Sequence, residues 1–460
     1  MITQRKTNVL VVGGGPGGYV AAIRAGQCGL ETTLVEASRV GGTCLIRGCI
    51  PSKALIHAAG LFDEMRHAAR AGGHFGIHLP APPRLDFAET IAWKESVVDK
   101  LNSGVSALLA KAKVNIVQGW ARFSDAKTCM VETPDGVVQI SAAHVILATG
   151  SKPVELPQLP FGDAVMSSTE ALSLTARPER LVVVGAGYIG LELGTAFARM
   201  GTEVTIVEAQ SKILPLYDET LSAPVARWLE RRKVGLHLGA QAMGLEGGAL
   251  LIKTPTGDMV RLETDKVLVT VGRTPVTTGL EDMGLAMAGR FIKVDACCAT
   301  STRNVWAIGD VVGEPMLAHK ASAQGEMVAE IIAGHKRRFM PAAIPAVCFT
   351  EPEIVTVGVF AQGPDYKVGI FPFQANGRAL SMAAGEEGGF VRTIAEKATG
   401  RIVGIQAVGR HISELAGEFA ALVELGATLE DVAGIIHAHP TLGEATQESA
   451  LKALGHALHI

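Results

Sequence analysis

The most regular pattern in the chain is a short run of apolar residues that ends in a cluster of glycines. Residues 8–13 read NVLVVG, and GGGPGG occupies residues 13–18. An uninterrupted apolar run of this length is typical of a strand buried on both faces of a parallel sheet. The following residues, YVAAIRAGQCG, predict a helix of small side chains, and TTLVE predicts a second strand that ends at Glu36. The pattern therefore predicts a strand, a tight turn, a helix and a second strand.

The glycines of this turn have the spacing that a nucleotide phosphate requires. Gly13, Gly15 and Gly18 stand in GxGxxG register, which allows a tight turn, a close approach to a pyrophosphate and close packing of helix on sheet. Glu36 follows about 20 residues later, where a carboxylate can accept a hydrogen bond from a ribose hydroxyl. A tight turn that binds nothing is the alternative, but the complete unit favours a dinucleotide site.

The same arrangement recurs at residues 181–208, which read LVVVGAGYIGLELGTAFARMGTEVTIVE. Gly185, Gly187 and Gly190 repeat the glycine spacing, and Glu208 ends the second strand. Two such units predict two bound dinucleotides. Because Glu208 would repel a 2′-phosphate and no arginine cluster stands next to it, we expect the second site to prefer NAD to NADP.

Two further strand-and-turn segments suggest how the chain connects these units. HVILATG ends at Gly150, and NVWAIGD ends at Asp310. Asp310 can bind a cofactor hydroxyl, or it can serve only as a cap or turn residue. Prolines at 153, 157 and 160 suit the first crossing between domains, and those at 341 and 345 suit the last.

The predicted fold is α/β, with two Rossmann-like domains, one inserted in the other, and a C-terminal α+β domain. The predicted parts are 1–150, 151–275, 276–341 and 342–460.

Cys44 and Cys49 stand in GGTCLIRGCIPSK, close behind the first nucleotide unit. In a regular helix, residues five apart are separated by a rise of about 7.5 Å, whereas the Cα atoms of a disulfide lie about 4.4 to 6.8 Å apart. We therefore expect Gly48 and Pro51 to make this segment an irregular start of a helix. A dithiol beside a redox cofactor can pass two electrons to or from a disulfide. Two unrelated buried thiols are the alternative, and a metal site would need more ligands than the segment supplies.

A histidine near the C-terminus has the chemistry to activate a thiol. HAHPTLGE places His439 before a proline and five residues before Glu444. Imidazole is the natural base near neutral pH, and a carboxylate on its other nitrogen would fix the tautomer. The segment from Thr441 to Glu444 also reads as a capping box that opens a helix through Gln447 and beyond. His437 is expected to point elsewhere and to be structural.

Composition limits the partners and the location of the protein. The 42 Lys and Arg residues nearly balance the 45 Asp and Glu residues, so no electrostatic feature favours nucleic acid or a membrane surface. No apolar stretch reaches about 18 residues and no signal peptide is evident, so we expect a cytoplasmic protein. Seven cysteines without regular spacing argue against a structural disulfide framework. The neighbours Cys297 and Cys298 are expected to be ordinary core thiols.

Together these motifs resemble the pyridine nucleotide-disulfide oxidoreductases, and the resemblance covers essentially the whole chain. The motifs that carry it, in family order, are GGGPGG, GGTCLIRGCIPSK, GAGYIGLELG, TVGRTP, WAIGDVVGEPMLAHKA and HAHPTLGEA. GEPMLAHKA and the ending GHALHI are most similar to bacterial members that serve a branched-chain 2-oxoacid dehydrogenase complex. The resemblance implies FAD at the first site, NAD at the second and a C-terminal domain that forms a homodimer.

The resemblance also implies a reaction and roles for individual residues. The reaction is the oxidation of protein-bound dihydrolipoamide to lipoamide with reduction of NAD, on a lipoyl domain tethered to an acyltransferase core. Cys44 would exchange with the substrate dithiol, and Cys49 would contact the flavin. His439, which would reach in from the partner subunit and be oriented by Glu444, would deprotonate the substrate. No metal is implied.

The resemblance further implies an ion pair between Lys53 and Glu192 beside the flavin, although either residue could be a surface helix charge. Tyr188 would cover the flavin until nicotinamide arrives, or would simply pack. The residues implied for FAD are Gly13, Gly15, Gly18, Glu36, Thr43, Lys53, Gly119, Asp310 and Ala318. Those implied for NAD are Gly185, Gly187, Gly190, Glu208 and Gly272.

The chain departs from the family pattern at two places. Ile46 and Arg47 follow the CL of the cysteine motif, where the family usually has Asn, and this puts the redox tuning of the dithiol in doubt. The stretch 357–371 is also shorter than the segment that usually follows TEPE in the family, so a surface helix of the C-terminal domain is expected to be trimmed.

Rival functions predict sequence features that differ from those of this chain. A glutathione reductase would carry basic residues near the second ribose, a mercuric reductase would carry a C-terminal cysteine pair, and a soluble transhydrogenase would lack one active cysteine. A non-catalytic nucleotide-binding assembly subunit would have lost a redox group, yet Cys44, Cys49, His439 and Glu444 are all present.

Overall fold

The protein is described by a computed structural model that covers residues 2–70, 72–384 and 388–460. The chain divides into two compact units. The first consists of Met1–Glu155, Ser167–Ala176 and Val271–Met340, and the second of Leu156–Met166, Arg177–Thr270 and Pro341–Ile460. Because the first unit resumes at Val271, the nucleotide part of the second unit is inserted into it, as the repeated motifs predict. The boundaries of the four predicted parts stay a prediction.

The first unit is built on a sheet of seven strands in the order β3-β2-β1-β6-β5-β4, with β19 also paired to β6. β1, β2, β3, β6 and β19 are joined by parallel pairings, whereas β5 and β4 form an antiparallel meander on the first half of β6. The strands are β1 Thr3–Val12, β2 Thr32–Glu36, β3 Asn115–Gln118, β4 Trp120–Phe123, β5 Thr128–Thr133, β6 Gly136–Leu147 and β19 Val305–Ala307.

Both faces of this sheet are covered. Val9 and Val11 of β1 belong to one hydrophobic core, and Leu10 and Val12 belong to another. Since neighbouring residues of a strand point to opposite faces, this alternation explains why the last four residues of β1, Val9 to Val12, are apolar without interruption. The first of these cores also includes residues from α1 (Pro16–Gln27) and α8 (Ala318–Ile332).

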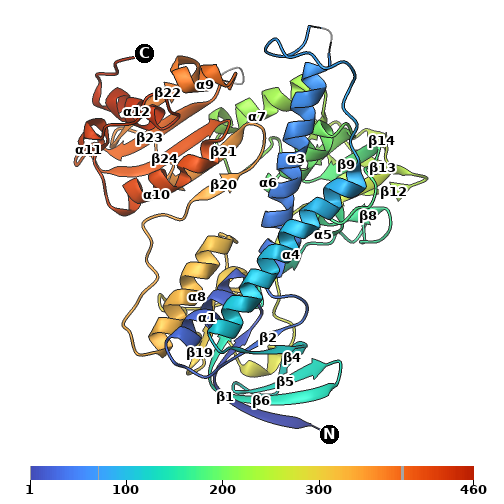
Figure 1. Cartoon of the computed structure of the whole chain (residues 1–460), viewed down its shortest axis with the longest axis vertical. Coiled ribbons are helices and arrows are strands. Elements are labelled where there is room, and N and C mark those ends of the chain that lie inside the picture. Colours follow the sequence, from blue (N-terminus) through green and yellow to red (C-terminus); the bar gives the residue numbers. More distant parts are fainter. Residues whose placement is uncertain (1, 71, 385–387) are drawn as a thin grey trace. The chain divides into compact units, whose positions relative to one another are not determined.

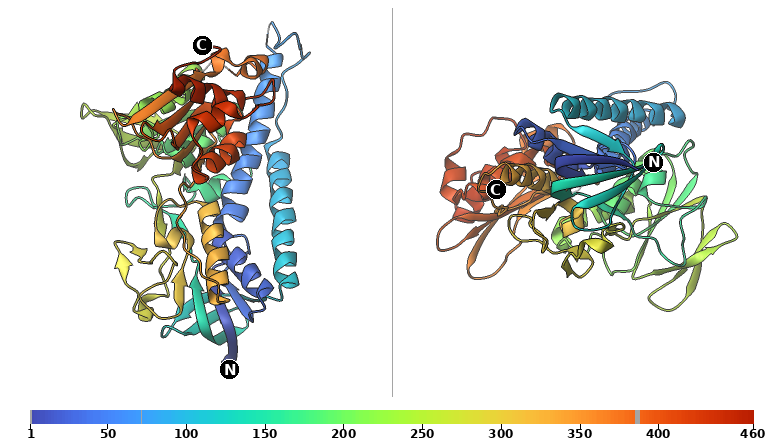
Figure 2. Two further views of the ribbon diagram at one scale, coloured as in Figure 1. Left: turned by 90° about the vertical axis from the view of Figure 1, so that its left-hand side faces the viewer. Right: turned by 90° about the horizontal axis from the view of Figure 1, so that it is seen from below.

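Two long helices of the first unit, α3 (Cys49–Ala68) and α4 (Phe87–Lys111), lie side by side (Figures 1 and 2). Asp86 caps α4, because its side chain accepts a hydrogen bond from the amide of Glu89. The unit is completed by short elements. These are α2 Gly42–Arg47, α5 Ser168–Ala171, β7 Ser151–Pro153, β16 Arg273–Pro275, β17 Met287–Ala288, β18 Phe291–Ile292 and the 3₁₀ helices η1 Glu281–Met283 and η2 Gly309–Val312.

The second unit contains a second nucleotide-type sheet of five parallel strands in the order β11-β10-β9-β15-β8. An antiparallel sheet, β12-β13-β14, follows it. The strands are β8 Val165–Met166, β9 Arg180–Val184, β10 Glu203–Glu208, β11 Gly235–Leu238, β12 Gln241–Glu246, β13 Ala249–Lys253, β14 Met259–Glu263 and β15 Lys266–Val269, and the helices are α6 Tyr188–Arg199 and α7 Glu219–Arg231.

The C-terminal part of the second unit is an antiparallel sheet of five strands in the order β20-β21-β24-β23-β22, packed with helices around its own core (Figure 1). β21 and β22 are joined by residues 359–365, which form a loop. The strands are β20 Ala346–Cys348, β21 Glu353–Gly358, β22 Tyr366–Pro372, β23 Phe390–Glu396 and β24 Ile402–Gly409, and the helices are α9 Gly377–Ser381, α10 Ala416–Glu424, α11 Leu429–Gly434 and α12 Glu444–Leu454, with η3 Phe373–Ala375 and η4 Ile412–Leu415.

In the described part of the chain, every helix is too short or too polar to cross a lipid bilayer.

Candidate active site

The first glycine turn has a geometry that only glycine permits. Gly13 has φ 98°, and a Cβ there would lie 2.2 Å from the carbonyl oxygen of Ala148. A Cβ on Gly18 would lie 1.7 Å from the carbonyl oxygen of Gly13, so α1 packs directly against the turn. The carboxylate of Glu36 accepts hydrogen bonds from the amides of Gly14 (2.6 Å) and Ser38 (2.8 Å).

The second turn reproduces these contacts almost residue for residue. Gly185 has φ 105°, and a Cβ on Gly190 would lie 2.1 Å from the carbonyl oxygen of Gly185. The carboxylate of Glu208 accepts hydrogen bonds from the amides of Ala186 and Gln210, both at 2.7 Å. The repeated sequence pattern therefore corresponds to a repeated three-dimensional structure.

Both turns fit a dinucleotide pyrophosphate. α1 begins after Gly15 and α6 after Gly187, and neither helix has a side chain bonded to its first amides. A Cβ on Gly187 would meet no atom within 4 Å, and one on Gly15 would meet only the Cα of Gly42 at 3.9 Å. The helix N-termini thus present amide donors and a partial positive charge to open space, which suits a phosphate group.

The cysteine segment is an interrupted helix, as its spacing predicts. α2 ends at Arg47, Gly48 has the non-helical angles φ −146° and ψ −108°, and α3 begins at Cys49. A Cβ on Gly48 would lie 2.8 Å from the carbonyl oxygen of Thr43. Pro51 lies in the first turn of α3, where its missing N–H costs no hydrogen bond. The interruption allows two cysteines that are five residues apart to approach each other.

The side chains of Cys44 and Cys49 interact with each other. The hydrogen bond with Cys49 and burial raise the pKa of the Cys44 thiol, and the nearby Lys53 ammonium opposes this increase. Cys44 is half-buried and Cys49 is exposed. Lys53 of α3 therefore lies close enough to the dithiol to act on its charge.

The residues that depart from the family pattern have different surroundings. Ile46 packs against the core beneath α2. Arg47 donates a hydrogen bond from Nη2 to the hydroxyl of Ser38 (3.1 Å), while its Nε is buried without an acceptor among the described atoms. Arg47 therefore connects the cysteine segment to the residues around Glu36.

Other predicted residues of the first unit hold its backbone together. The amide of Gly119 donates to the carbonyl of Glu36 at 2.9 Å, and a Cβ on Gly119 would lie 2.4 Å from the carbonyl oxygen of Glu132. Thr43 lies in α2, and Ala318 is the first residue of α8. Their predicted contacts with FAD stay predictions.

Asp310 belongs to a polar chain that sequence reasoning missed. The hydroxyl of Ser151 donates to Asp310 Oδ2 at 2.5 Å, and Arg273 Nε donates to Ser151 Oγ at 2.7 Å. Ser151 directly follows the ATG turn, and Arg273 lies in TVGRTP, so their positions beside these motifs were the available signal. Gly272, which precedes Arg273, has φ 119° and accepts a hydrogen bond from the amide of Val154.

His439 and Glu444 meet as predicted: Nδ1 of His439 lies 2.8 Å from Oε1 of Glu444. The other carboxylate oxygen accepts a hydrogen bond from the amide of Thr441 at 2.8 Å. α12 begins at Glu444 and not at Thr441, whose hydroxyl bonds to the carbonyl of Ala438. Only half of the capping box therefore forms, and one carboxylate holds both the imidazole and the backbone.

Burial acts to raise the pKa of Glu444, but the hydrogen bonds from Thr441 and His439 outweigh it and lower that pKa. The carboxylate consequently stays charged and can stabilise an imidazolium at His439. The His439 side chain is 79% exposed, and the neighbouring Ile436 is 95% exposed. The ring is thus accessible to an external thiol.

Glu192 is buried in α6 and accepts a hydrogen bond from the amide of Phe349 at 2.9 Å. The predicted ion pair between Glu192 and Lys53 involves the two different units and stays a prediction. Tyr188, the first residue of α6, is 40% exposed, and its predicted role over the flavin also stays a prediction.

One expectation about the other cysteines is wrong in part. Cys298 is buried, and burial raises the pKa of its thiol to about 12. Cys297 is only half-buried, and its sulfur bonds to the carbonyl of Arg337 at 3.5 Å. It lies at the edge of the core because Asp295 caps this turn by accepting from the amides of Cys297 and Ala299.

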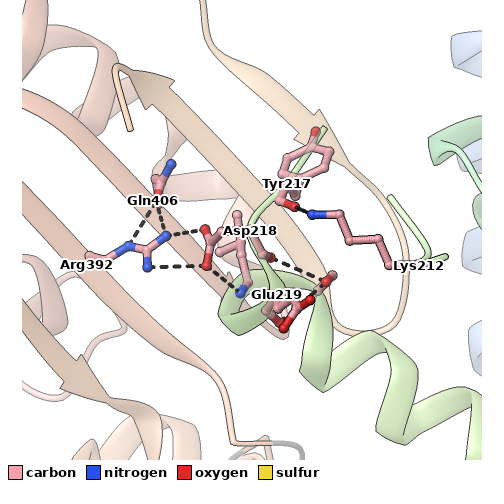
Figure 3. Close-up of polar contacts among 8 residues, drawn as sticks. Lys212, Tyr217, Asp218, Glu219, Arg392 and Gln406 are labelled. Carbon is pink, nitrogen blue, oxygen red and sulfur yellow. Dashed lines mark hydrogen bonds and ion pairs between the residues drawn. The ribbon is translucent and has the colours of Figure 1, made fainter. Parts of the chain in front are cut away.

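A buried ion pair in the second unit also escaped sequence reasoning. Arg392 of β23 donates from Nη2 to Oδ2 of Asp218 at 2.5 Å and from Nε to Oε1 of Gln406 at 2.9 Å (Figure 3). The side chain of Arg392 is 2% exposed, and its guanidinium lies 4.6 Å from the ring centre of Phe360. Asp218 caps α7, so the pair connects the nucleotide part of this unit to the C-terminal sheet.

The two nucleotide turns, the dithiol and the histidine–carboxylate pair define a flavin- and nicotinamide-type disulfide oxidoreductase. The chain belongs to the pyridine nucleotide-disulphide oxidoreductase family, which it matches over residues 7–325, and residues 344–450 match the dimerisation domain of that family. Both the resemblance read from the motifs and the predicted fold class are thereby confirmed.

Individual relatives extend this likeness over the whole chain. A dihydrolipoyl dehydrogenase of Pseudomonas aeruginosa is 56% identical and aligns over 99% of both chains. One of Halobacterium salinarum is 46% identical over 98% of this chain and 97% of its own. The solved structure of LpdA from Mycobacterium tuberculosis superposes with a TM-score of 0.87 at 26% identity, covering 98% of this chain and 99% of that one.

Proposed function

We propose that this chain is an NAD-dependent dihydrolipoyl dehydrogenase, which oxidises dihydrolipoamide to lipoamide and reduces NAD. The observation that carries the proposal is the dithiol of Cys44 and Cys49, whose segment packs on the first nucleotide turn. The relatives that match over the full length bear the name of this activity. The histidine–carboxylate pair supports the proposal, because a dithiol substrate needs a base.

Two cofactors fit the two turns. FAD would be held at Gly13, Gly15, Gly18 and Glu36, and NAD at Gly185, Gly187, Gly190 and Glu208. FAD, when bound, supplies the two-electron chemistry that links the dithiol to NAD. The protein supplies the binding, the orientation and the protonation states.

The chain's own residues would carry out a thiol–disulfide exchange with the substrate. His439 removes the proton of one substrate thiol, and the resulting thiolate attacks the sulfur of Cys44 in the Cys44–Cys49 disulfide. A mixed disulfide forms and Cys49 leaves as a thiolate. The second substrate thiol then attacks the substrate sulfur of the mixed disulfide, which releases cyclic lipoamide. The proton of this thiol passes to the sulfur of Cys44, which leaves as a thiol. Glu444 holds the imidazole in orientation and stabilises it while it carries the proton.

The dimerisation domain implies a homodimer. We propose that His439 acts at the partner subunit's dithiol and that Lys53 and Glu192 pair beside the flavin. The substrate would be the lipoyl domain of a cytoplasmic 2-oxoacid dehydrogenase complex with an acyltransferase core, and GEPMLAHKA and GHALHI favour the branched-chain complex.

A substrate panel tests the proposed function. The purified protein should be yellow and should reduce NAD with free dihydrolipoamide, and it should fail with NADPH and glutathione disulfide. The Cys44→Ser variant should lose dihydrolipoamide oxidation while it retains bound flavin. Activity that survives this substitution would contradict the mechanism, and strong NADPH-linked reduction of glutathione disulfide would contradict the assignment.

A further inference from the structure

His437 stands two residues before the proposed base, and its ring is held at both nitrogens. Nδ1 lies 3.0 Å from the carbonyl oxygen of Ile435, and Nε2 lies 3.1 Å from Oε1 of Glu418 in α10. A backbone carbonyl and a carboxylate are both acceptors, so each ring nitrogen must carry a hydrogen to make both bonds. This geometry describes an imidazolium paired with a carboxylate, and only 10% of the His437 side chain is exposed.

The loop that carries His439 is held from two sides through these contacts. Gln447 of α12 donates from Nε2 to the carbonyl oxygens of Ala433 (2.9 Å) and Ile435 (3.0 Å). The carbonyl of Ile435 therefore binds both His437 and Gln447. Glu444, on the same helix as Gln447, holds His439. The loop between α11 and α12 is thus fixed by α12 on one side and by Glu418 of α10 on the other.

The charges around His437 favour its protonated form. The hydrogen bond to Glu418 raises the pKa of His437 above its ordinary value of 6.5, burial opposes the shift, and the Ile435 carbonyl and the charge of Glu444 add to it. His437 lines a cavity of about 540 Å³. The charged and titratable residues that line the cavity with it are Arg378 of α9, His411 before η4, Glu414 of η4 and Glu418 of α10.

We propose that His437 is a positioning residue for the reaction: as an imidazolium held by Glu418, it fixes the loop that places His439 against Glu444. This inference rests on the proposed function, because it assigns His437 to the step in which His439 takes the substrate proton. It assigns His437 no contact with the substrate, so His437 acts only through His439.

A pH dependence follows from the sign of the shift. A histidine whose pKa is raised in the folded protein keeps its contacts complete below pH 6.5 and loses them as the pH rises through the raised value. The Nε2–Glu418 bond should therefore weaken on the alkaline side. Dihydrolipoamide oxidation should decline there, in addition to any titration of the dithiol.

The test compares three variants of the flavin-loaded dimer. H437Q replaces the ring and so cannot donate to both the Ile435 carbonyl and Glu418 as the imidazolium does. E418Q keeps an acceptor for His437 but removes the negative charge. H411N is the control, because His411 lines the same cavity but does not make the contacts of His437. For each variant, kcat/KM for dihydrolipoamide is measured between about pH 6 and 9, the range in which histidines titrate. The oxidation of NADH by an artificial electron acceptor serves as a second readout, because it bypasses the dithiol and His439.

We expect H437Q to lower kcat/KM for dihydrolipoamide about tenfold or more, a size typical of a displaced base. The NADH–acceptor rate should stay within about twofold, since that reaction passes through neither the dithiol nor His439. E418Q should move the alkaline decline to lower pH, because its neutral amide no longer raises the pKa of His437. H411N should resemble wild type in both reactions.

Two results would overturn the inference. One is an H437Q variant with the pH profile and kcat/KM of H411N, and the other is a parallel loss of both reactions, which would indicate a general defect of folding. A wild-type enzyme that fails to oxidise dihydrolipoamide would instead overturn the proposed function and the inference with it.

Discussion

Gly42 packs on Gly15 so closely that a Cβ at Gly42 would lie 2.5 Å from the Cα of Gly15. The amide of Gly41 also donates to the carbonyl of Gly14 at 2.7 Å. The first residue of the cysteine segment is therefore in contact with the glycine turn of the first nucleotide site. This contact fixes the position of the cysteine segment relative to the first glycine turn.

The variant Gly42→Ala tests this contact. The new Cβ would collide with backbone, and alanine is strained at φ 57°, so we expect the variant to be purified with less bound flavin and to melt at a lower temperature. Flavin absorbance per polypeptide and thermal unfolding measure the effect. Gly104→Ala is the control, because Gly104 is exposed in α4 with no atom near its Cβ position. That control should be neutral or slightly stabilising, and an equal loss of flavin in both variants would contradict the interpretation.

Glu444→Gln removes a charge and keeps the shape of the side chain. The amide oxygen can still accept from His439 Nδ1 or Thr441, but it no longer stabilises an imidazolium. We expect kcat/KM for dihydrolipoamide to fall about 100-fold or more, with little change in the KM for NAD. Steady-state kinetics with each substrate varied in turn separates the two effects. A variant with full activity would show that Glu444 serves only to hold the backbone at Thr441, ahead of α12.

Arg392→Met leaves Asp218 without its partner. Breaking a buried ion pair from one side costs about 3 to 5 kcal/mol, so the free energy of unfolding in urea should decrease by about this amount. Arg401→Met is the matched control, since Arg401 pairs with Glu396 at the surface at 2.8 Å and such pairs contribute only about 0 to 1 kcal/mol. The double variant R392M/D218N should recover part of the loss. Equal destabilisation by R392M and R401M would contradict this account.

The same ion pair predicts an acid dependence. Burial acts to raise the pKa of Asp218, but the hydrogen bond and charge of Arg392, with the hydrogen bonds from Thr220 and Leu221, outweigh it and hold the pKa below its ordinary value of 3.8. A lowered carboxylate pKa contributes stability that is present above pH 3.8 and is lost as the pH falls through the folded value. Without Arg392, burial is opposed only by the hydrogen bonds from Thr220 and Leu221, so the pKa of Asp218 should be higher than in wild type. R392M should therefore unfold at a higher pH than wild type in an acid titration followed by circular dichroism.

Glu208→Gln tests the choice between nicotinamide cofactors. The amide keeps one acceptor for the turn but no longer repels a 2′-phosphate. We expect the ratio of kcat/KM for NADP to that for NAD to rise about tenfold or more. Glu203→Gln, at the exposed start of the same strand, is the control and should leave the ratio unchanged. A ratio that rises equally in both variants would indicate a general electrostatic effect.

Much of the site could be predicted from the sequence because its information is local. The turns at Gly13 and Gly185 need glycine for their positive φ, and the carboxylates at Glu36 and Glu208 follow at the end of the next strand. The interruption at Gly48 followed from the spacing of the two cysteines together with the glycine between them and Pro51 after them. In each case a short stretch of chain contains both the constraint and the residue that satisfies it.

The pairs that escaped prediction join residues distant in sequence. Arg392 and Asp218 are 174 residues apart, and Ser151 and Arg273 are 122 apart. A charged residue in a strand pattern reads as exposed, so nothing near Arg392 signals that its guanidinium is buried against Asp218 and Gln406. His437 was expected to be structural. Its contact with Glu418 could not be predicted from the sequence, because it depends on the packing of α10.

The sequence by itself determined that this protein has two dinucleotide turns, a dithiol and a histidine–carboxylate pair, since these features depend on backbone conformations that a few residues specify. Only the tertiary structure decided which charges are buried, which carbonyls the histidines bind and how closely Gly42 approaches Gly15. The physical reason is that burial and hydrogen bonding depend on the packing of segments that are far apart in the chain. Contacts between distant segments determine the burial and hydrogen bonding of the site residues, whereas short stretches of sequence determine which residue types the site contains.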